Sequence, residues 1–180
     1  MGQGSSMNND SLKKSAVKLQ AQKMTNYKGS AIKWHSWKKK TRAMTGTAGL
    51  LQILDNEDYA KKNEIDNQTV FHMLQATTVK GYAAHLVDKH ESTRDGYAAY
   101  NKLVSWYESD ELTSETAEDV RAKLDKTFLN TRTSASQYVK DFLQYTKQLE
   151  NLDESYTESK TIQIFLDQIT DPDYQATKSF

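Results

Sequence analysis

Four cations lie close together in the first third of the sequence, at Lys38, Lys39, Lys40 and Arg42. They fall within about one turn of an expected helix, so their side chains could neutralise neighbouring phosphates and release counterions. That chemistry binds the backbone of a nucleic acid without reading its base sequence. The commoner use of such a cluster is a solvated helix face that balances an acidic neighbour, and this alternative stays open.

The surroundings of the cluster offer further contacts of the same kind. Lys13 and Lys14 of the N-terminal segment could equally contact RNA. Trp34 and Trp37 could stack on bases, but two tryptophans spaced i, i+3 opposite a lysine face more often anchor a core, and we favour that interpretation. Residues 1–50 contain ten Lys or Arg residues and one acid, so this end carries about +9 and the remainder about −9. Such asymmetry indicates either a polyanionic partner, most simply RNA, or head-to-tail attraction between copies.

Catalysis and metal binding find little support. The chain has no cysteine, which excludes disulfides, thiol catalysis and cysteine-ligated zinc. No two of its four histidines have the i, i+4 spacing that directs two imidazoles at one metal. There is neither a G-x-S-x-G motif nor a glycine-rich phosphate loop. We therefore expect a protein without enzymatic activity, cofactor, bound metal or small-molecule substrate.

The N-terminus raises the question of a membrane. Met1 to Ser6 match the M-G-x-x-x-[ST] pattern, which would place a myristoyl group on Gly2 while nearby lysines supply the second, electrostatic signal. We favour a flexible tail, or a cloning remnant ahead of a native start at Met7, so a membrane is expected only if Gly2 is acylated. No segment approaches the roughly 20 apolar residues of a membrane span. We expect a soluble, cytoplasmic protein.

The elements that must position these residues are helices. One proline and seven glycines in 180 residues favour an all-α chain of about six helices. Residues 1–26, rich in small and polar residues, are expected to form a disordered basic tail. Apolar spacing predicts helices over 31–45, 67–86, 93–108 and 115–128, one opened by Ser134 and one opened by Thr157 that Pro172 closes. In the second of these, the buried face would include Phe71, Leu74, Thr78, Tyr82 and Leu86.

The helix opened by Ser134 has the strongest pattern. Its apolar residues step by four, three, four and three from Tyr138 to Leu152, which places them on one stripe. We favour ordinary core packing for this stripe. The alternative is that Tyr138, Phe142 and Tyr145 contact another subunit, because tyrosine tolerates the wet edge of an interface.

Apolar and aromatic residues from position 97 onward follow one another in a characteristic order. They are Ala98-x-Tyr100-x-x-Leu103-x-x-x-Tyr107, the segment 124–129, Ser134-x-Ser136-x-Tyr138-Val139-x-x-Phe142, Leu149, and Thr161-Ile162-x-x-Phe165-Leu166-x-x-Ile169 followed by Tyr174. In order and spacing they resemble the Gag capsid region of copia-type LTR retrotransposons. Upstream, Trp34 and Trp37 followed by Leu50 and Leu51 are similar to the start of the same region, so the resemblance covers residues 27–178.

This resemblance implies a structural protein with two small helical lobes, expected at residues 27–130 and 131–180, that self-assembles into particles around RNA. The zinc knuckle, protease, integrase and reverse transcriptase of a full polyprotein are missing, so we expect a fragment or a domesticated copy with a shortened second lobe. The alternative function is a monomeric helical adaptor or nucleic-acid-binding module that builds no shell.

Overall fold

The computed structural model describes residues 26–175, and within them it contains ten α-helices, α2 to α11, and no strand. The prediction of an all-α protein is confirmed for this part of the chain, although the helices are more numerous and shorter than expected. The chain divides into two compact units between Ser109 and Asp110. The sequence places the boundary between lobes later, after residue 130. The expected tail lies outside the described residues except for Asn26.

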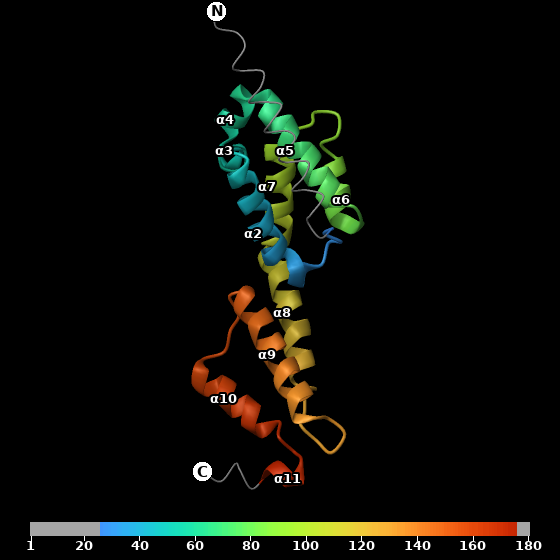
Figure 1. Cartoon of the computed structure of the whole chain (residues 1–180), viewed down its shortest axis with the longest axis vertical. Helices are drawn as coiled ribbons and strands as arrows, with labels where there is room; N and C mark the ends of the chain where they lie inside the picture. Colours follow the sequence, from blue (N-terminus) through green and yellow to red (C-terminus); the bar gives the residue numbers. More distant parts are fainter. Residues whose placement is uncertain (1–25, 176–180) are drawn as a thin grey trace, which may run out of the picture. The chain divides into compact units, whose positions relative to one another are not determined.

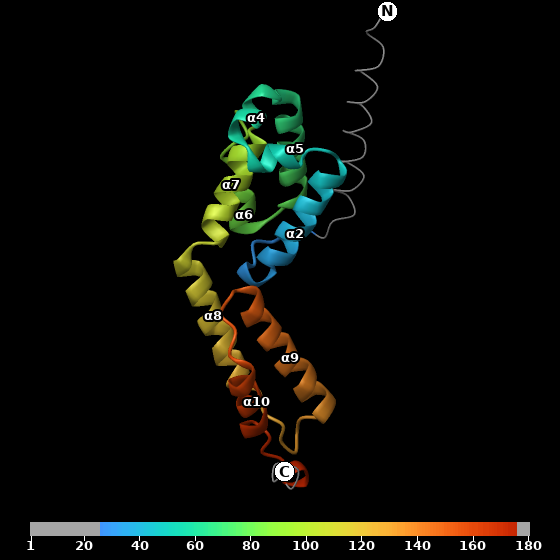
Figure 2. The same ribbon diagram turned by 90° about the vertical axis from the view of Figure 1, so that its left-hand side faces the viewer.

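Unit 1 comprises six helices with a shared core. They are α2 (Ala31–Thr47), α3 (Leu51–Asp55), α4 (Glu57–Lys62), α5 (Glu64–Thr77), α6 (Gly81–Asp88) and α7 (Gly96–Tyr107). The central helix is α7, which packs against α3, α4, α5 and α6 (Figure 2). Its aromatic and leucine side chains therefore meet several helices at once, which explains why Leu103 is fully buried.

The crossing of α5 and α7 depends on the absence of a side chain at Gly96. A Cβ atom there would lie 2.6 Å from the carbonyl oxygen of Asn67. Asn67 was predicted to cap the N-terminus of a helix, and this is wrong because α5 begins three residues earlier, at Glu64. Its side chain instead holds the start of α7, since Asn67 Oδ1 accepts from the backbone N–H of Tyr97 at 2.9 Å. Asp95 caps α7 by accepting from the N–H of Ala98 at 3.0 Å.

The single helix predicted over residues 67–86 is interrupted. It ends at Thr77 and restarts at Gly81, whose φ of +77° is a conformation that favours glycine. A Cβ atom at Gly81 would lie 2.8 Å from the carbonyl oxygen of Lys28, so the segment 26–30 passes close to this break. The restart changes the direction of the following residues. Tyr82, predicted to be buried, is exposed.

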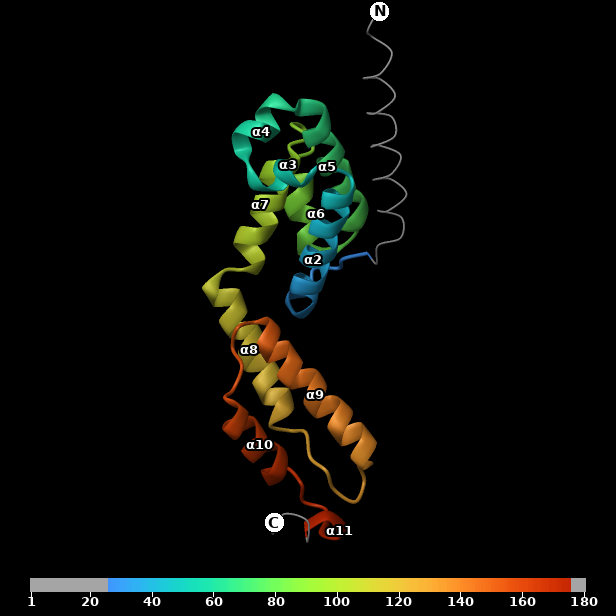
Figure 3. The same cartoon turned by 60° about the vertical axis from the view of Figure 1, so that its left-hand side comes forward.

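Unit 2 contains α8 (Asp110–Leu124), α9 (Ala135–Asn151), α10 (Glu158–Asp167) and the short α11 (Pro172–Gln175). Helices α8 and α9 lie side by side and run in opposite directions (Figures 1 and 3). Helix α8 begins within the acidic stretch that the sequence suggested as a spacer, because Asp110 and Glu111 stabilise its first turn. Since α8 packs extensively on α9, the compact unit begins at Asp110 rather than after residue 130.

Both predicted caps of unit 2 are confirmed. The hydroxyl of Ser134 accepts from the N–H of Gln137 at 3.2 Å, and that of Thr157 accepts from the N–H of Lys160 at 3.3 Å. The Gln137 side chain donates to Asp141 at 2.7 Å instead of completing a capping box. Pro172 does not close α10, which ends at Asp167, but occupies the first position of α11.

Candidate functional site

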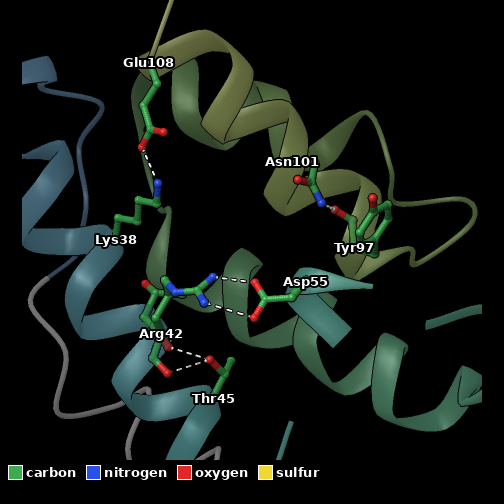
Figure 4. Close-up of polar contacts among 8 residues, drawn as sticks. Lys38, Arg42, Thr45, Asp55, Tyr97, Asn101 and Glu108 are labelled. Atoms are coloured by element: carbon green, nitrogen blue, oxygen red, sulfur yellow. Dashed lines mark hydrogen bonds and ion pairs between the residues drawn. The ribbon is translucent and has the colours of Figure 1, made fainter. Parts of the chain in front are cut away.

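The basic cluster lies on α2, where the fold separates its four cations into two pairs. Lys38 Nζ lies 2.6 Å from Glu108 Oε1. Arg42 donates two hydrogen bonds to the carboxylate of Asp55, at 2.6 and 3.0 Å. Figure 4 shows both side chains extending from α2 toward these acids. Because Lys38 and Arg42 are four residues apart, they share one side of the helix, and that side meets acidic partners.

The ionisation of these groups follows from their contacts. Partial burial opposes the charged form of Glu108, but hydrogen bonds from Lys38 and from the Trp34 indole outweigh burial and lower its pKa below the ordinary value. The carboxylate of Asp55 raises the pKa of Arg42 further above its already high value. Both ion pairs are therefore fully charged at neutral pH. Their cations are locally balanced, which is the alternative that the sequence left open for the cluster.

Lys39 and Lys40 differ from their two neighbours because both are exposed. No ion pair involves either residue among the contacts of the described part of the chain. The segment 26–50 contains no Asp or Glu, so their field is not cancelled by neighbours on α2. The other predicted basic contacts, Lys13 and Lys14, and the predicted lipidation site Gly2 lie outside the described residues. The cluster thus keeps two available cations.

The two tryptophans beside the cluster belong to the core of unit 1. Trp34 is fully buried and Trp37 is nearly so. Trp34 stacks on Tyr107 with a centroid distance of 4.8 Å, and Trp37 stacks on Tyr27 at 5.1 Å. The indole N–H of Trp34 donates to Glu108 at 2.8 Å. The interpretation of these tryptophans as core anchors is confirmed, and neither offers a ring face to bases.

An exposed aromatic pair lies elsewhere in unit 1, where the sequence interpretation did not place one. The side chains of Tyr82 on α6 and Trp106 on α7 are in contact at a centroid distance of 4.6 Å. They remain 44% and 42% exposed, respectively. One signal could have found Trp106: it lies outside the stripe of α7 that contains Leu103 and Tyr107. Tyr82 carried no such signal, because its exposure depends on the break at Gly81.

The aromatic stripe of α9 is occupied within unit 2. Tyr138 and Phe142 are 1% and 3% exposed, and both rings pack against Phe165 of α10. The Tyr138 hydroxyl donates to the backbone carbonyl of Phe165 at 2.6 Å, and burial raises the pKa of Tyr138 to about 12. Tyr145 is half-buried. Of the three residues suggested for an oligomer interface, Tyr138 and Phe142 are thus core residues, since α10 covers them.

Unit 2 nevertheless exposes aliphatic side chains on two helices. Leu143 on α9 is 60% exposed and Ile162 on α10 is 53% exposed, with Val139 and Leu166 one turn from them. Helix α10 has no fully buried residue, although its sequence is amphipathic. We call Val139, Leu143, Ile162 and Leu166 the aliphatic surface of unit 2.

A groove adjoins this surface. Helix α10 contacts the first half of α9 through Phe165, whereas beside the second half of α9 it leaves a cavity of about 440 Å³. The residues of its walls include Leu143, Thr146 and Leu149 on α9, and Glu158 and Thr161 on α10. A concave site with leucine walls and charged edges can accept an apolar side chain from another molecule.

Other classes of site were compared with the same coordinates. Between residues 26 and 175, no three His, Asp or Glu side chains are grouped as a metal ion would require. None of the helices of that part has the length and apolar character needed to cross a bilayer. Neither family models, nor curated proteins, nor solved structures give a match to this chain.

Proposed function

We propose that this chain is a structural, Gag-like capsid protein of a copia-type LTR retrotransposon, which assembles with copies of itself and packages RNA without sequence preference. The resemblance of the apolar spacings supports the family, and an all-helical chain in two compact units is compatible with two capsid lobes. The proposal includes no catalytic role, no cofactor and no small-molecule substrate.

The observation that carries the proposal is the aliphatic surface of unit 2. Four aliphatic side chains, each at least 39% exposed, lie on two adjacent helices that already share an aromatic core. Apolar area left in water at this density is typical of a protein contact site. A small contact repeated in many copies gains stability when several are closed at once, so weak pairwise binding suffices to build a particle.

RNA binding is assigned to the basic N-terminal part of the chain. Lys39 and Lys40 are the cations of the α2 cluster that are free to meet phosphates, whereas Lys38 and Arg42 already neutralise acids. Lys13 and Lys14 remain candidates on sequence grounds. Contacts of this kind recognise only the phosphate backbone, which suits packaging of RNA irrespective of its sequence.

Size-exclusion chromatography and negative-stain microscopy, with and without RNA, test the assembly. We expect round particles at high protein concentration, promoted by RNA. The double variant Val139→Asp with Leu143→Asp should abolish them, because two charges cannot be buried unpaired in a contact. Ile65→Asp is the matched control, since Ile65 is 56% exposed but lies in unit 1. A monodisperse monomer at high concentration with RNA would instead favour the monomeric adaptor.

The RNA assignment has its own test. Reversing the charge of Lys39 and Lys40 should weaken RNA retention and flatten its dependence on salt, while the helical content measured by circular dichroism stays unchanged. Lys62→Glu, at an exposed lysine of α4, is the control. Reversal of Lys38 and Arg42 should mainly destabilise unit 1, because it opposes like charges at Glu108 and Asp55. An unchanged salt slope in the Lys39 and Lys40 variant would remove both residues from the RNA site.

A further inference from the structure

The aromatic pair formed by Tyr82 and Trp106 lies on the surface of two adjacent helices. The rings are tilted by 51° to each other, and each keeps more than two fifths of its residue surface in contact with solvent. His85 extends the pair on α6, with its ring centroid 5.8 Å from that of Tyr82. Exposing a tryptophan and a tyrosine together is costly in water, because these are the side chains with the largest apolar area.

The charges around this pair are predominantly positive. Lys102 lies four residues before Trp106 on α7 and therefore on the same side of that helix, and it is exposed. Lys80 immediately precedes α6 and is also exposed. Lys28 comes close to the start of α6, because its carbonyl oxygen lies where a Cβ of Gly81 would be. Helix α7 contains no Asp or Glu, and α6 contains one acid, Asp88.

Aromatic faces among lysines suit a ligand that is both flat and polyanionic. Unpaired nucleic-acid bases stack on aromatic side chains whatever their identity, and the adjoining phosphates attract cations. A protein partner would be favoured by a broader apolar patch of mixed shape, such as the aliphatic surface of unit 2. Around the aromatic pair the exposed neighbours are polar or charged, namely Lys80, His85, Lys102 and Ser105.

We propose that Tyr82 and Trp106 form a stacking site for the bases of single-stranded RNA, with Lys80 and Lys102 as phosphate contacts. This inference rests on the proposed RNA packaging and names the form of RNA that unit 1 accepts, which is unpaired RNA. It also adds a contribution that is insensitive to salt, because stacking releases no counterions. The cations of α2 and of the N-terminal segment supply the salt-sensitive part.

The test uses the full chain and a fluorescein-labelled oligouridine of about 12 nucleotides, which falls within the range of single-strand site sizes. Fluorescence anisotropy measures its Kd over a series of salt concentrations. Trp106→Ala and Tyr82→Ala should each weaken binding about tenfold, while the slope of log Kd against log salt concentration stays unchanged. Trp106→Phe should retain most of the affinity, because a phenyl ring still stacks.

Two controls separate stacking from other effects. Ile65→Ala removes an exposed apolar side chain of unit 1 away from the pair and should leave Kd unchanged. Lys80→Ala and Lys102→Ala should reduce the salt slope by about 0.7 for each phosphate contact that is lost. A blunt-ended RNA duplex should bind the Trp106→Ala variant as well as the wild type, because its bases are already stacked.

Three results would overturn the inference in distinguishable ways. If the wild type fails to bind oligouridine at low salt, RNA packaging itself fails and the stacking site with it. If the wild type binds but Trp106→Ala and Tyr82→Ala bind equally well, only the stacking site fails. If these variants bind RNA normally but lose particles in negative stain, the pair is a contact between protein subunits. Circular dichroism and thermal melts confirm that each variant is folded.

Discussion

The two units expose different kinds of apolar surface. In unit 1 the exposed pair is aromatic and stands among lysines, whereas in unit 2 the exposed side chains are aliphatic and the adjoining groove has both Lys147 and Glu150 on its wall. The first combination suits a polyanion with flat bases, and the second suits a protein partner of mixed charge. The difference teaches that RNA binding and self-association need not compete for one surface.

The cores of the units differ in the same sense. In unit 1 each helix from α2 to α7 has at least one buried residue. In unit 2 helix α10 has none, and its contacts with α9 are made by the half-buried Phe165. Unit 1 therefore satisfies its apolar residues internally, while unit 2 leaves part of that requirement to a partner.

The strongest way to break this comparison is to remove the largest side chain from the core of unit 1. Trp34→Ala should destabilise unit 1 by about 3–5 kcal/mol, because it leaves a large cavity and removes the stacking on Tyr107. Hydrogen exchange measured by mass spectrometry should rise in peptides from α2 to α7 and stay near the wild-type rate in α8 and α9. An equal rise in both units would show that they do not unfold separately.

A smaller loss is expected where α5 and α7 cross. Gly96→Ala should cost about 1–3 kcal/mol, because the new methyl group would meet backbone atoms at 2.6 and 2.7 Å that cannot move independently. Gly46→Ala is the matched control. A Cβ there meets nothing within 4 Å, and α2 should gain about 0.5–1 kcal/mol. Urea unfolding followed by tryptophan fluorescence measures both, and equal midpoints would contradict the role of the close crossing.

The ion pair of Lys38 and Glu108 gives the next effect. Glu108→Ala leaves the buried indole N–H of Trp34 without its acceptor and should cost about 1–3 kcal/mol, whereas Glu108→Gln keeps an acceptor and should cost less. The folded state lowers the Glu108 pKa from the ordinary value of 4.5, so its contribution is present above that value. The stability difference between wild type and Glu108→Gln should shrink as pH falls below 4.5. A difference that grows there would reverse the assigned sign.

Sequence patterns predicted the local features of this fold well. The caps at Ser134 and Thr157 could be read directly, because each hydroxyl bonds an N–H three residues away. The inward side of α2 was also predictable from the spacing of Trp34, Trp37, Thr41 and Met44, all of which are buried. These features depend on neighbours within one or two turns, which a sequence displays directly.

Features that depend on distant partners could not be predicted. The break before Gly81 is fixed by the backbone of Lys28, and the role of Asn67 by Asp95, which lies 28 positions along the chain. Aromatic residues occur on several sides of α7, so spacing alone did not show that Trp106 faces solvent. For the candidate site, the contiguous cations predicted one uniform patch. The acids that divide it, Asp55 and Glu108, belong to α3 and to the end of α7.

The smallest predicted effect sharpens the comparison from the side of unit 2. Tyr138→Phe keeps the buried ring but removes the hydroxyl that donates to the Phe165 carbonyl, so it should cost about 1 kcal/mol. The loss should be confined to the attachment of α10, because this is the bond that links the buried ring of α9 to the backbone of α10. Hydrogen exchange should therefore rise in α10 and remain unchanged throughout unit 1. If exchange in α10 stays at the wild-type rate, the packing of Phe165 alone holds this helix, and its exposed leucine and isoleucine would be presented on a firmer base than we infer.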